Sequence, residues 1–211
     1  MIDRVDMDLR GRLLGIRDQG PRPTCLAHAV TAAHENARAA FTPLSPDYLH
    51  FFAAQITPPP SGVSMEQVAL ALRTQGQVEE AHCPYSLTDP PTGWRPPTGI
   101  REYRRASEHK DADIDAVADW ILQGQVPVLG ISLPESFFTP KAPWVLTSHG
   151  SIRGLHAVAA VGVGYHGGTR AILVRNSWGE DWGSRGHVWL EETFLIRHLK
   201  EVLLLTDEMN I

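Results

Sequence analysis

A cysteine stands where a helix is expected to begin. Cys25 follows the turn-forming segment DQGPRPT and opens the run CLAHAVTAAHENARAA, which predicts a buried helix over residues 25–40 with Thr24 as its N-cap. The first turn of a helix offers unpaired backbone N–H groups and the positive end of the helix dipole, and both favour a thiolate. Cys25 is therefore a candidate nucleophile with a depressed pKa. The alternative is a small packed side chain, the usual state of a free cysteine.

A nucleophilic cysteine needs a base and a group that orients the base. His156 begins the apolar run HAVAAVGVGY and Asn176 ends the run RAILVRNS, with a hairpin turn predicted at GYHGGT. Pairing of these strands brings the two side chains together, so the amide can fix the imidazole tautomer. Trp178 can shield that hydrogen bond from water. Two alternatives stay open: NSWG is only a turn with a packed indole, and His28 is another base near Cys25.

The elements that must position these residues change in type along the chain. Helices are expected over 25–40, 45–53, 65–76 and 113–123, and strands over 127–133, 156–165, 170–177 and 187–192. The proline-rich tract 88–99 can hold neither a helix nor a central strand, and it is interpreted as the crossover between two lobes. The pattern indicates an α+β chain with a cleft between a helical and a β-rich half.

Composition narrows the class of protein. The 211 residues are 43% hydrophobic, and the net charge of -5 argues against nucleic acid as a partner. No apolar run is long enough to cross a membrane, and the N-terminus lacks the apolar core of a signal peptide. Cys83 is expected to be a free packed thiol, which favours a reducing, cytoplasmic setting, with export by a non-standard route left open. No Cys/His cluster has metal-ligand spacing, so no metal is predicted.

Three blocks, DQGPRPTC, LHAVAAVG and VRNSWGEDWGSRGHVWL, resemble in order the catalytic blocks of the papain/cathepsin cysteine peptidase family. His156 and Asn176 follow Cys25 by roughly 130 and 150 residues, as in that family. The resemblance implies one papain-like catalytic domain over residues 1–211. It implies a helical lobe over 13–100, an antiparallel β-barrel lobe over 101–211, and an active site in the cleft between them.

The resemblance also implies residue roles. Cys25 is expected to be the nucleophile, His156 its imidazolium partner and later the general acid, and Asn176 the orienting residue. Gln19 is expected to donate its side-chain amide to the oxyanion, beside the backbone N–H of Cys25. No cofactor is expected.

The implied activity is that of a cysteine endopeptidase acting on a protein or peptide through a thioester acyl-enzyme. Two alternatives remain: an acyltransferase, transamidase or deamidase with the same Cys-His-Asn chemistry, and an inactive papain-fold binding module. A proteinaceous inhibitor is a further candidate partner, and the oligomeric state is left open.

The resemblance places a substrate pocket beside the cysteine. Its residues are expected to be mostly apolar, with no acid to meet a basic side chain, which predicts an aliphatic or aromatic preference two positions before the scissile bond. The expected substrate-binding residues are Gly62, Val63, Ser64, Ile131, Leu155, Ala157 and Trp178.

Two residues depart from the family pattern. Arg22 stands where the family has a disulfide cysteine, and Leu26 replaces the aromatic residue after the nucleophile. These departures, together with the absence of a long prosegment, are typical of a bacterial-style intracellular relative.

Overall fold

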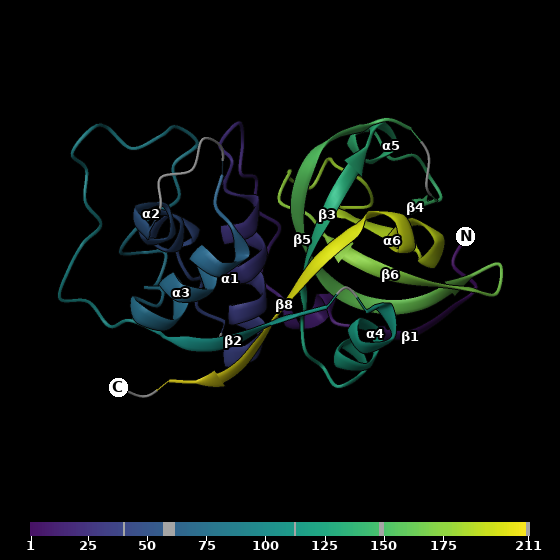
Figure 1. Cartoon of the computed structure of the whole chain (residues 1–211), viewed down its shortest axis with the longest axis horizontal. Helices are drawn as coiled ribbons and strands as arrows, with labels where there is room; N and C mark the ends of the chain where they lie inside the picture. The colour runs from purple at the N-terminus through teal and green to yellow at the C-terminus, as the bar shows by residue number, and fades with distance from the viewer. Residues whose placement is uncertain (40, 57–61, 112, 148–149, 210–211) are drawn as a thin grey trace.

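Two bodies lie side by side, one made of helices and one built on a curled sheet (Figure 1). The computed structural model describes residues 1–39, 41–56, 62–111, 113–147 and 150–209. The helical body holds α1 (Cys25–Arg38), α2 (Pro46–Ile56) and α3 (Met65–Thr74), which pack on one another. Helix α1 lies at the boundary, where it also packs on strand β5 (Ile152–His166). The boundary helix is therefore the element that carries residue 25 to the sheet.

Helix α1 is buried along most of its length because its small residues allow close approach on two sides. Ten consecutive residues, 26–35, are buried, and the helix ends at Arg38 with Ala39 in the left-handed conformation. The expected helix over 25–40 is thus confirmed to within its last turn, and residue 40 lies outside the described residues. Helix α3 begins with a capping box between Ser64 and Gln67, which fixes its first turn.

The described residues hold one eight-stranded sheet, in the order β2-β8-β3-β5-β6-β7-β4, with β1 paired to β5. All the pairs are antiparallel except β4 with β7, which is parallel. Helices α4, α5 and α6 and the short 3-10 helix η1 accompany it. The bounds are β1 (Arg4–Asp8), η1 (Arg10–Arg12), β2 (Arg105–Lys110), α4 (Ile114–Leu122), β3 (Val128–Pro134), α5 (Glu135–Phe138), β4 (Val145–Leu146), β6 (Thr169–Arg175), β7 (His187–Glu191), α6 (Glu192–His198) and β8 (Leu199–Glu208).

The β5–β6 hairpin sets the position of two predicted site residues. Its register pairs Ala159 with Arg175, and the turn falls at the predicted glycine pair between His166 and Thr169. Three residues before Ala159 is His156, and one residue after Arg175 is Asn176. Both side chains therefore lie at the end of the hairpin that faces α1. The predicted hairpin is confirmed.

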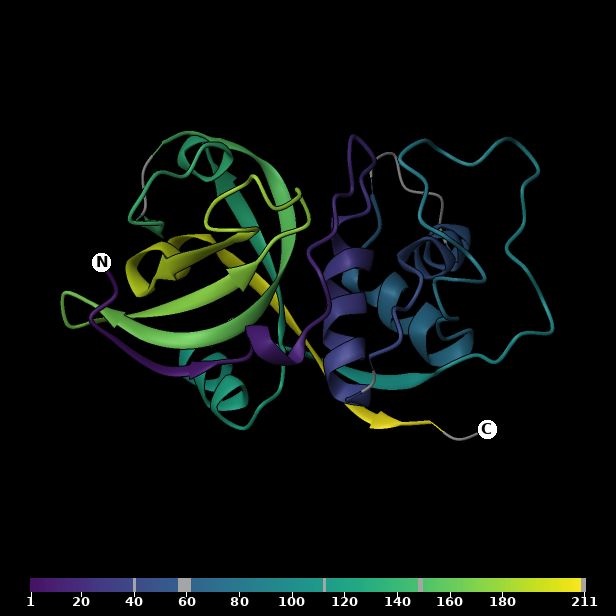
Figure 2. The same ribbon diagram turned by 180° about the vertical axis from the view of Figure 1, so that it is seen from behind.

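The interpretation of the proline-rich tract 88–99 is wrong. This segment lies on the outer side of the helical body, where Trp94 contacts Phe51 of α2 at 5.4 Å between ring centroids (Figures 1 and 2). The chain leaves the helical body only after it, along β2. Strands β1, β2, β4 and β8 were not expected from the sequence. Two of them, β1 and β2, are short and rich in charged residues, which masks the period-two pattern.

Candidate active site

Cys25 is the first residue of α1 and is half-buried. Thr24 precedes the helix as expected, but its hydroxyl does not cap it. Instead Thr24 Oγ1 lies 2.8 Å from the hydroxyl of Tyr85. Thr24 therefore stands at the predicted N-cap position, but the capping hydrogen bond expected from its side chain is not formed. The placement of Cys25 in the first helical turn is confirmed.

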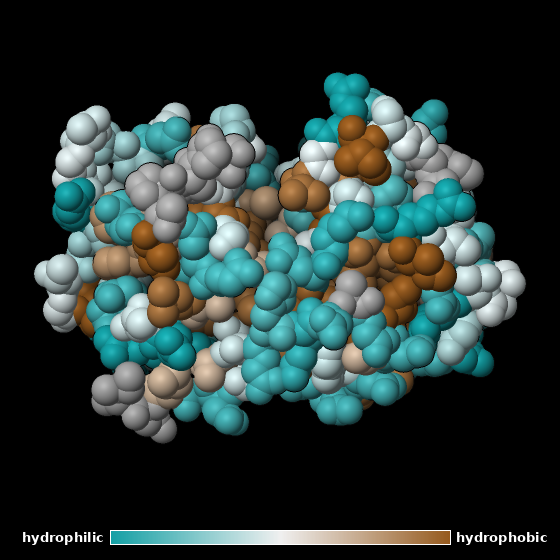
Figure 3. Space-filling view, viewed as in Figure 1, coloured by the Kyte–Doolittle hydropathy of each residue, from teal (hydrophilic) through white to brown (hydrophobic). Residues whose placement is uncertain are grey.

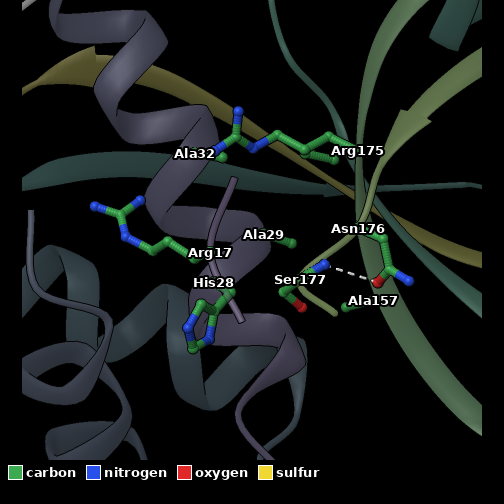
Figure 4. A pocket seen from close by; sticks show the side chains of 9 residues that line it. Arg17, His28, Ala29, Ala32, Ala157, Arg175, Asn176 and Ser177 are labelled. Carbon is green, nitrogen blue, oxygen red and sulfur yellow. Dashed lines mark hydrogen bonds between the residues drawn. The ribbon is translucent and has the colours of Figure 1, made fainter. Parts of the chain in front are cut away.

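His156 and Asn176 form the pair that the hairpin was expected to create. Nε2 of His156 lies 2.7 Å from Oδ1 of Asn176 in a buried hydrogen bond. The same oxygen accepts the backbone N–H of Ser177 at 2.8 Å, drawn as the dashed line in Figure 4. Since the amide oxygen can only accept, Nε2 of the neutral ring carries the proton and Nδ1 keeps its lone pair. His156 is thus held in one tautomer, with Nδ1 available as a base.

Aromatic rings cover this pair. Trp178 lies 4.7 Å from His156 between ring centroids, and Phe138 stacks on the outer side of the indole at 5.5 Å. Phe137 meets the edges of both rings at 5.9 and 5.6 Å. Trp178 therefore lies against His156, as its predicted shielding role requires. Trp178 does not line the substrate cavity described below, so the structure does not bring it together with the other predicted substrate-binding residues.

Cys25 and His156 meet in one cavity of about 590 Å³ between the two bodies. The backbone N–H of Ala157, the residue after His156, is close enough to the Cys25 thiol to lower its pKa. The cysteine at the start of α1 therefore lies beside the start of the apolar part of β5. The surface is notched between the two bodies, and hydrophobic side chains show inside the notch (Figure 3).

Burial changes the acid–base behaviour of both groups. It raises the pKa of the Cys25 thiol more than the N–H groups of Ala157, Leu26 and Cys25 lower it. It also lowers the pKa of His156 from 6.5 to about 4, although the hydrogen bond that His156 donates to Asn176 opposes this shift. The expectation of a depressed pKa for Cys25 is therefore wrong, because removing the thiolate from water outweighs the helix start.

Two hydrogen bonds fix the side chain of Gln19 in the segment that leads to α1. Its Nε2 donates to the carbonyl oxygen of Arg22 at 2.7 Å, and its Oε1 accepts the hydroxyl of Ser177 at 2.7 Å. The amide nitrogen carries two hydrogens, so one remains for a second acceptor. The side chain is buried, and its orientation is set by the hydroxyl of Ser177. This geometry suits an oxyanion donor.

The predicted pocket residues gather in the same cavity as Cys25 and His156. Residues 62–64 enter from the segment before α3, residue 131 from β3, and residues 155 and 157 from β5. Leu155 is 78% exposed, an apolar side chain without cover at the rim. The six residues brought together are Gly62, Val63, Ser64, Ile131, Leu155 and Ala157.

One acid in this cavity was missed. Glu201 of β8 lines it and is paired with Gly130 of β3, and Lys200 lies beside it. A Cβ at Gly130 would lie 2.7 Å from Cγ of Glu201, so the glycine makes room for the glutamate. The expectation that no acid faces the pocket is therefore wrong. A glycine inside an apolar strand signals a close approach of this kind, but the partner residue follows only from the β3–β8 pairing.

His28 is not an alternative base for Cys25. It lines a separate cavity of about 10 Å³ behind α1, together with Arg17, Arg175 and Asn176 (Figure 4). Its Nδ1 bonds to the carbonyl oxygen of Thr24 at 3.0 Å, and burial lowers its pKa to about 4. The ring packs edge-on against Tyr85. These contacts show that His28 is a buried packing residue.

A second titratable cluster lies at the edge of the substrate cavity. Nδ1 of His109 is 3.7 Å from Glu66, and Nε2 is 3.2 Å from Glu201. One possible metal-ligand atom from each of Glu66, His109 and Glu201 lies within 4.8 Å of the other two, and side chains at this spacing could hold a metal ion. The two carboxylates face opposite nitrogens of one ring, so His109 can form an ion pair with each of them only when it is protonated. These residues are too far apart in sequence for a spacing motif to reveal them.

The remaining cysteine lies away from the site. Cys83 is buried against Tyr48 and Val78, and its carbonyl oxygen accepts the hydroxyl of Ser45. Both cysteines are free thiols. Among the described residues no helix is long and apolar enough to cross a bilayer.

Comparison with known proteins gives a family match over most of the chain. The model described as "Papain family cysteine protease" matches residues 3–197. Cathepsin K from Gallus gallus is 28% identical over 195 residues, which cover 88% of this chain and 58% of the relative. The chain thus spans about three fifths of the length of that curated relative.

Solved structures share the fold. Xylellain, a cysteine protease from Xylella fastidiosa, superposes with a TM-score of 0.79 at 22% identity, covering 98% of this chain and 87% of that one. The Carica candamarcensis cysteine protease CMS1MS2, in complex with E-64, gives a TM-score of 0.74 at 19% identity, with 96% and 98% covered. At these identities the likeness concerns the α+β architecture.

Proposed function

The chain belongs to the papain family of cysteine proteases, and from this we propose that it is an endopeptidase that cleaves peptide bonds through a thioester on Cys25. One observation carries the proposal. A half-buried cysteine at a helix start and a histidine held in one tautomer line one cavity that is open to a peptide, and the amide of Gln19 is held beside the segment that leads to the cysteine.

The reaction follows from these positions. Sulfur of Cys25 attacks the carbonyl carbon while Nδ1 of His156 takes the thiol proton. A C–S bond forms, and the carbonyl π electrons move to oxygen, where Gln19 and the N–H of Cys25 donate hydrogen bonds. His156 then gives its proton to the leaving amine as the C–N bond breaks. Water attacks the thioester, with His156 accepting one of its protons, and the acid leaves as the thiol forms again.

Asn176 and Trp178 support the base rather than the substrate. The hydrogen bond from Nε2 of His156 to Asn176 strengthens when the ring becomes charged, because a charged donor makes the stronger bond. The indole keeps water from that bond and keeps the local dielectric low. The hydrogen bond to Asn176 helps the ring to hold its proton transiently, against the burial that lowers the pKa of His156.

The cavity also suggests the substrate class. Its walls are largely apolar, with Leu155 exposed at the rim and Ile131 at the back. Glu201 adds a single carboxylate that can meet a basic side chain. We therefore propose a substrate with a large apolar residue or a lysine or arginine two positions before the scissile bond. Aspartate and glutamate are disfavoured because Glu201 repels them.

The test is cleavage profiling of a diverse peptide library by mass spectrometry with the wild type and the Cys25→Ala variant. Wild-type cleavage that is absent from the variant supports the proposal. Products joined to an added amine, formed faster than hydrolysis, would instead favour an acyltransferase. An epoxide such as E-64 is expected to label Cys25, while absence of both cleavage and labelling would favour an inactive binding module.

A further inference from the structure

The hydroxyl of Tyr85 joins the two sides of the oxyanion site. It donates to the carbonyl oxygen of Gln19 at 2.8 Å, and it lies 2.8 Å from Oγ1 of Thr24. A phenol has a single proton, and Gln19 receives it, so Thr24 is the donor in the second bond. One oxygen atom therefore ties Gln19 to the residue that directly precedes Cys25.

Gln19 forms hydrogen bonds with both bodies of the structure. From the β-rich side, Ser177 accepts the backbone N–H of Gln19 at 2.8 Å and donates its hydroxyl to the amide oxygen. From the helical side, the hydroxyl of Tyr85 donates to the backbone carbonyl of Gln19, and the carbonyl oxygen of Arg22 accepts from its side-chain amide. Ser177 therefore positions Gln19 relative to the neighbouring Asn176. The contacts with Tyr85 and Arg22 position Gln19 relative to Cys25, and Tyr85 is the one that also bonds the residue directly before the cysteine.

The tyrosine is itself held firmly. Its half-buried ring packs edge-on against His28 at 4.6 Å between centroids, and the guanidinium of Arg22 lies over it at 5.0 Å. Arg22 is fixed by a buried ion pair with Asp47 at 2.6 Å and by the carbonyl oxygen of Ser86 at 2.6 Å. Because these contacts hold the ring in place, the Tyr85 hydroxyl has a fixed position, which a residue that positions others must have.

We propose that Tyr85 is a positioning residue for the oxyanion site, acting through Gln19 and Thr24 without touching the substrate. The inference rests on the proposed peptidase function. It implies a selective defect, because the hydroxyl matters only when negative charge develops on the carbonyl oxygen. Steps that use the thiol alone should not depend on it.

The experiment compares Tyr85→Phe with Tyr48→Phe, a matched control whose hydroxyl donates to Glu102 at 3.0 Å away from the site. Three quantities are measured: kcat and KM for a peptide amide, affinity for a peptide aldehyde, and the rate of Cys25 alkylation by iodoacetamide. The aldehyde bonds to sulfur and places its oxygen in the oxyanion site, whereas alkylation forms no oxyanion.

For Tyr85→Phe we expect kcat and aldehyde affinity to fall about tenfold, the effect of one lost hydrogen bond that leaves a buried carbonyl unpaired. KM and the alkylation rate should stay within about twofold, and Tyr48→Phe should match the wild type in every measurement. In a Gln19→Ala background, Tyr85→Phe should have no further effect on kcat. Thr24→Val, which keeps the side-chain shape, should lower kcat by a smaller factor.

Two outcomes would overturn the inference. The first is a Tyr85→Phe variant that keeps wild-type kcat and aldehyde affinity. The second is a parallel loss of alkylation, which would show that the tyrosine acts on the thiol or on the fold as a whole. If the wild type itself cleaves no amide, the peptidase proposal fails, while aldehyde affinity still decides the role of Tyr85.

Discussion

Nε2 of His156 donates to Oδ1 of Asn176 at 2.7 Å beneath the ring of Trp178. This one contact decides which nitrogen of the imidazole can act as a base. Nδ1 keeps its lone pair, and it belongs to a ring that lines the same cavity as the thiol of Cys25. In the proposed mechanism the base therefore depends on Asn176, an amide that does not line this cavity.

The Asn176→Ala variant should lower kcat by about 10- to 100-fold with little change in KM. The buried ring loses the contact that fixes its tautomer, and the N–H of Ser177 loses its acceptor, each costing about 1–3 kcal/mol. Steady-state kinetics on a peptide amide is the measurement. A variant as active as the wild type would show that the tautomer is fixed by other contacts.

Cys25→Ala should abolish turnover, whereas Cys83→Ala should retain it. Cys83 is buried in a small cluster beside α2 and takes no part in the cavity. Both variants are to be assayed on the same peptide after circular dichroism confirms that they fold. Activity in the Cys25→Ala protein would exclude the assigned nucleophile.

The pH profile of kcat/KM should have an acid limb near pH 4. Below this value His156 is protonated while the thiol is still neutral, so the pair has lost its base. The alkaline limb should lie above the ordinary thiol pKa, because burial raises the pKa of Cys25. The profile is measured at pH values where intrinsic fluorescence shows the native state. An acid limb near 6.5 would mean that His156 is not desolvated.

Stability should fall as the solution is acidified from pH 6.5 toward pH 4. Four buried histidines have a pKa lowered from 6.5 to about 4, mainly by burial, so the unfolded chain binds more protons than the folded one across this window. Their contribution is fully present above pH 6.5 and is lost as pH falls through the folded value. Urea unfolding at several pH values measures it, and a flat profile would contradict the burial of these rings. They are His28, His34, His156 and His187.

Glu201→Leu should reduce kcat/KM for peptides with arginine two positions before the scissile bond, and it should leave the leucine peptide within about threefold. The carboxylate lines the cavity and is partly exposed, so its attraction is worth roughly 1 kcal/mol or somewhat more. Lys200→Leu, at the neighbouring position, is the matched control. Equal losses for both peptides would show that the substitution disturbs packing rather than charge.

The sequence predicted the catalytic pair because local patterns determine it. An apolar strand, a glycine turn and a second strand specify the hairpin, and the hairpin brings His156 to Asn176. Cys25 was predictable from a helix start. Glu201 and Tyr85 could not be predicted, because each is brought to the site by contact between distant segments of the chain. Glu201 comes from the pairing of β8 with β3, and Tyr85 comes from its hydrogen bond to Gln19. The pKa direction of Cys25 was missed because burial by the sheet cannot be read from α1 alone.

The ion pair between Arg22 and Asp47 has a consequence for how this protein tolerates its surroundings. Both side chains are 4% exposed, and together they tie the catalytic loop to α2 at the position where the family pattern has a disulfide cysteine. A buried pair of this kind costs about 3–5 kcal/mol when one partner is removed, yet it contains no bond that a thiol can reduce. Reductants that keep Cys25 active therefore leave this tether intact. The ion pair that holds this loop does not change with redox potential, whereas the free thiol of Cys25 three residues away can be oxidised.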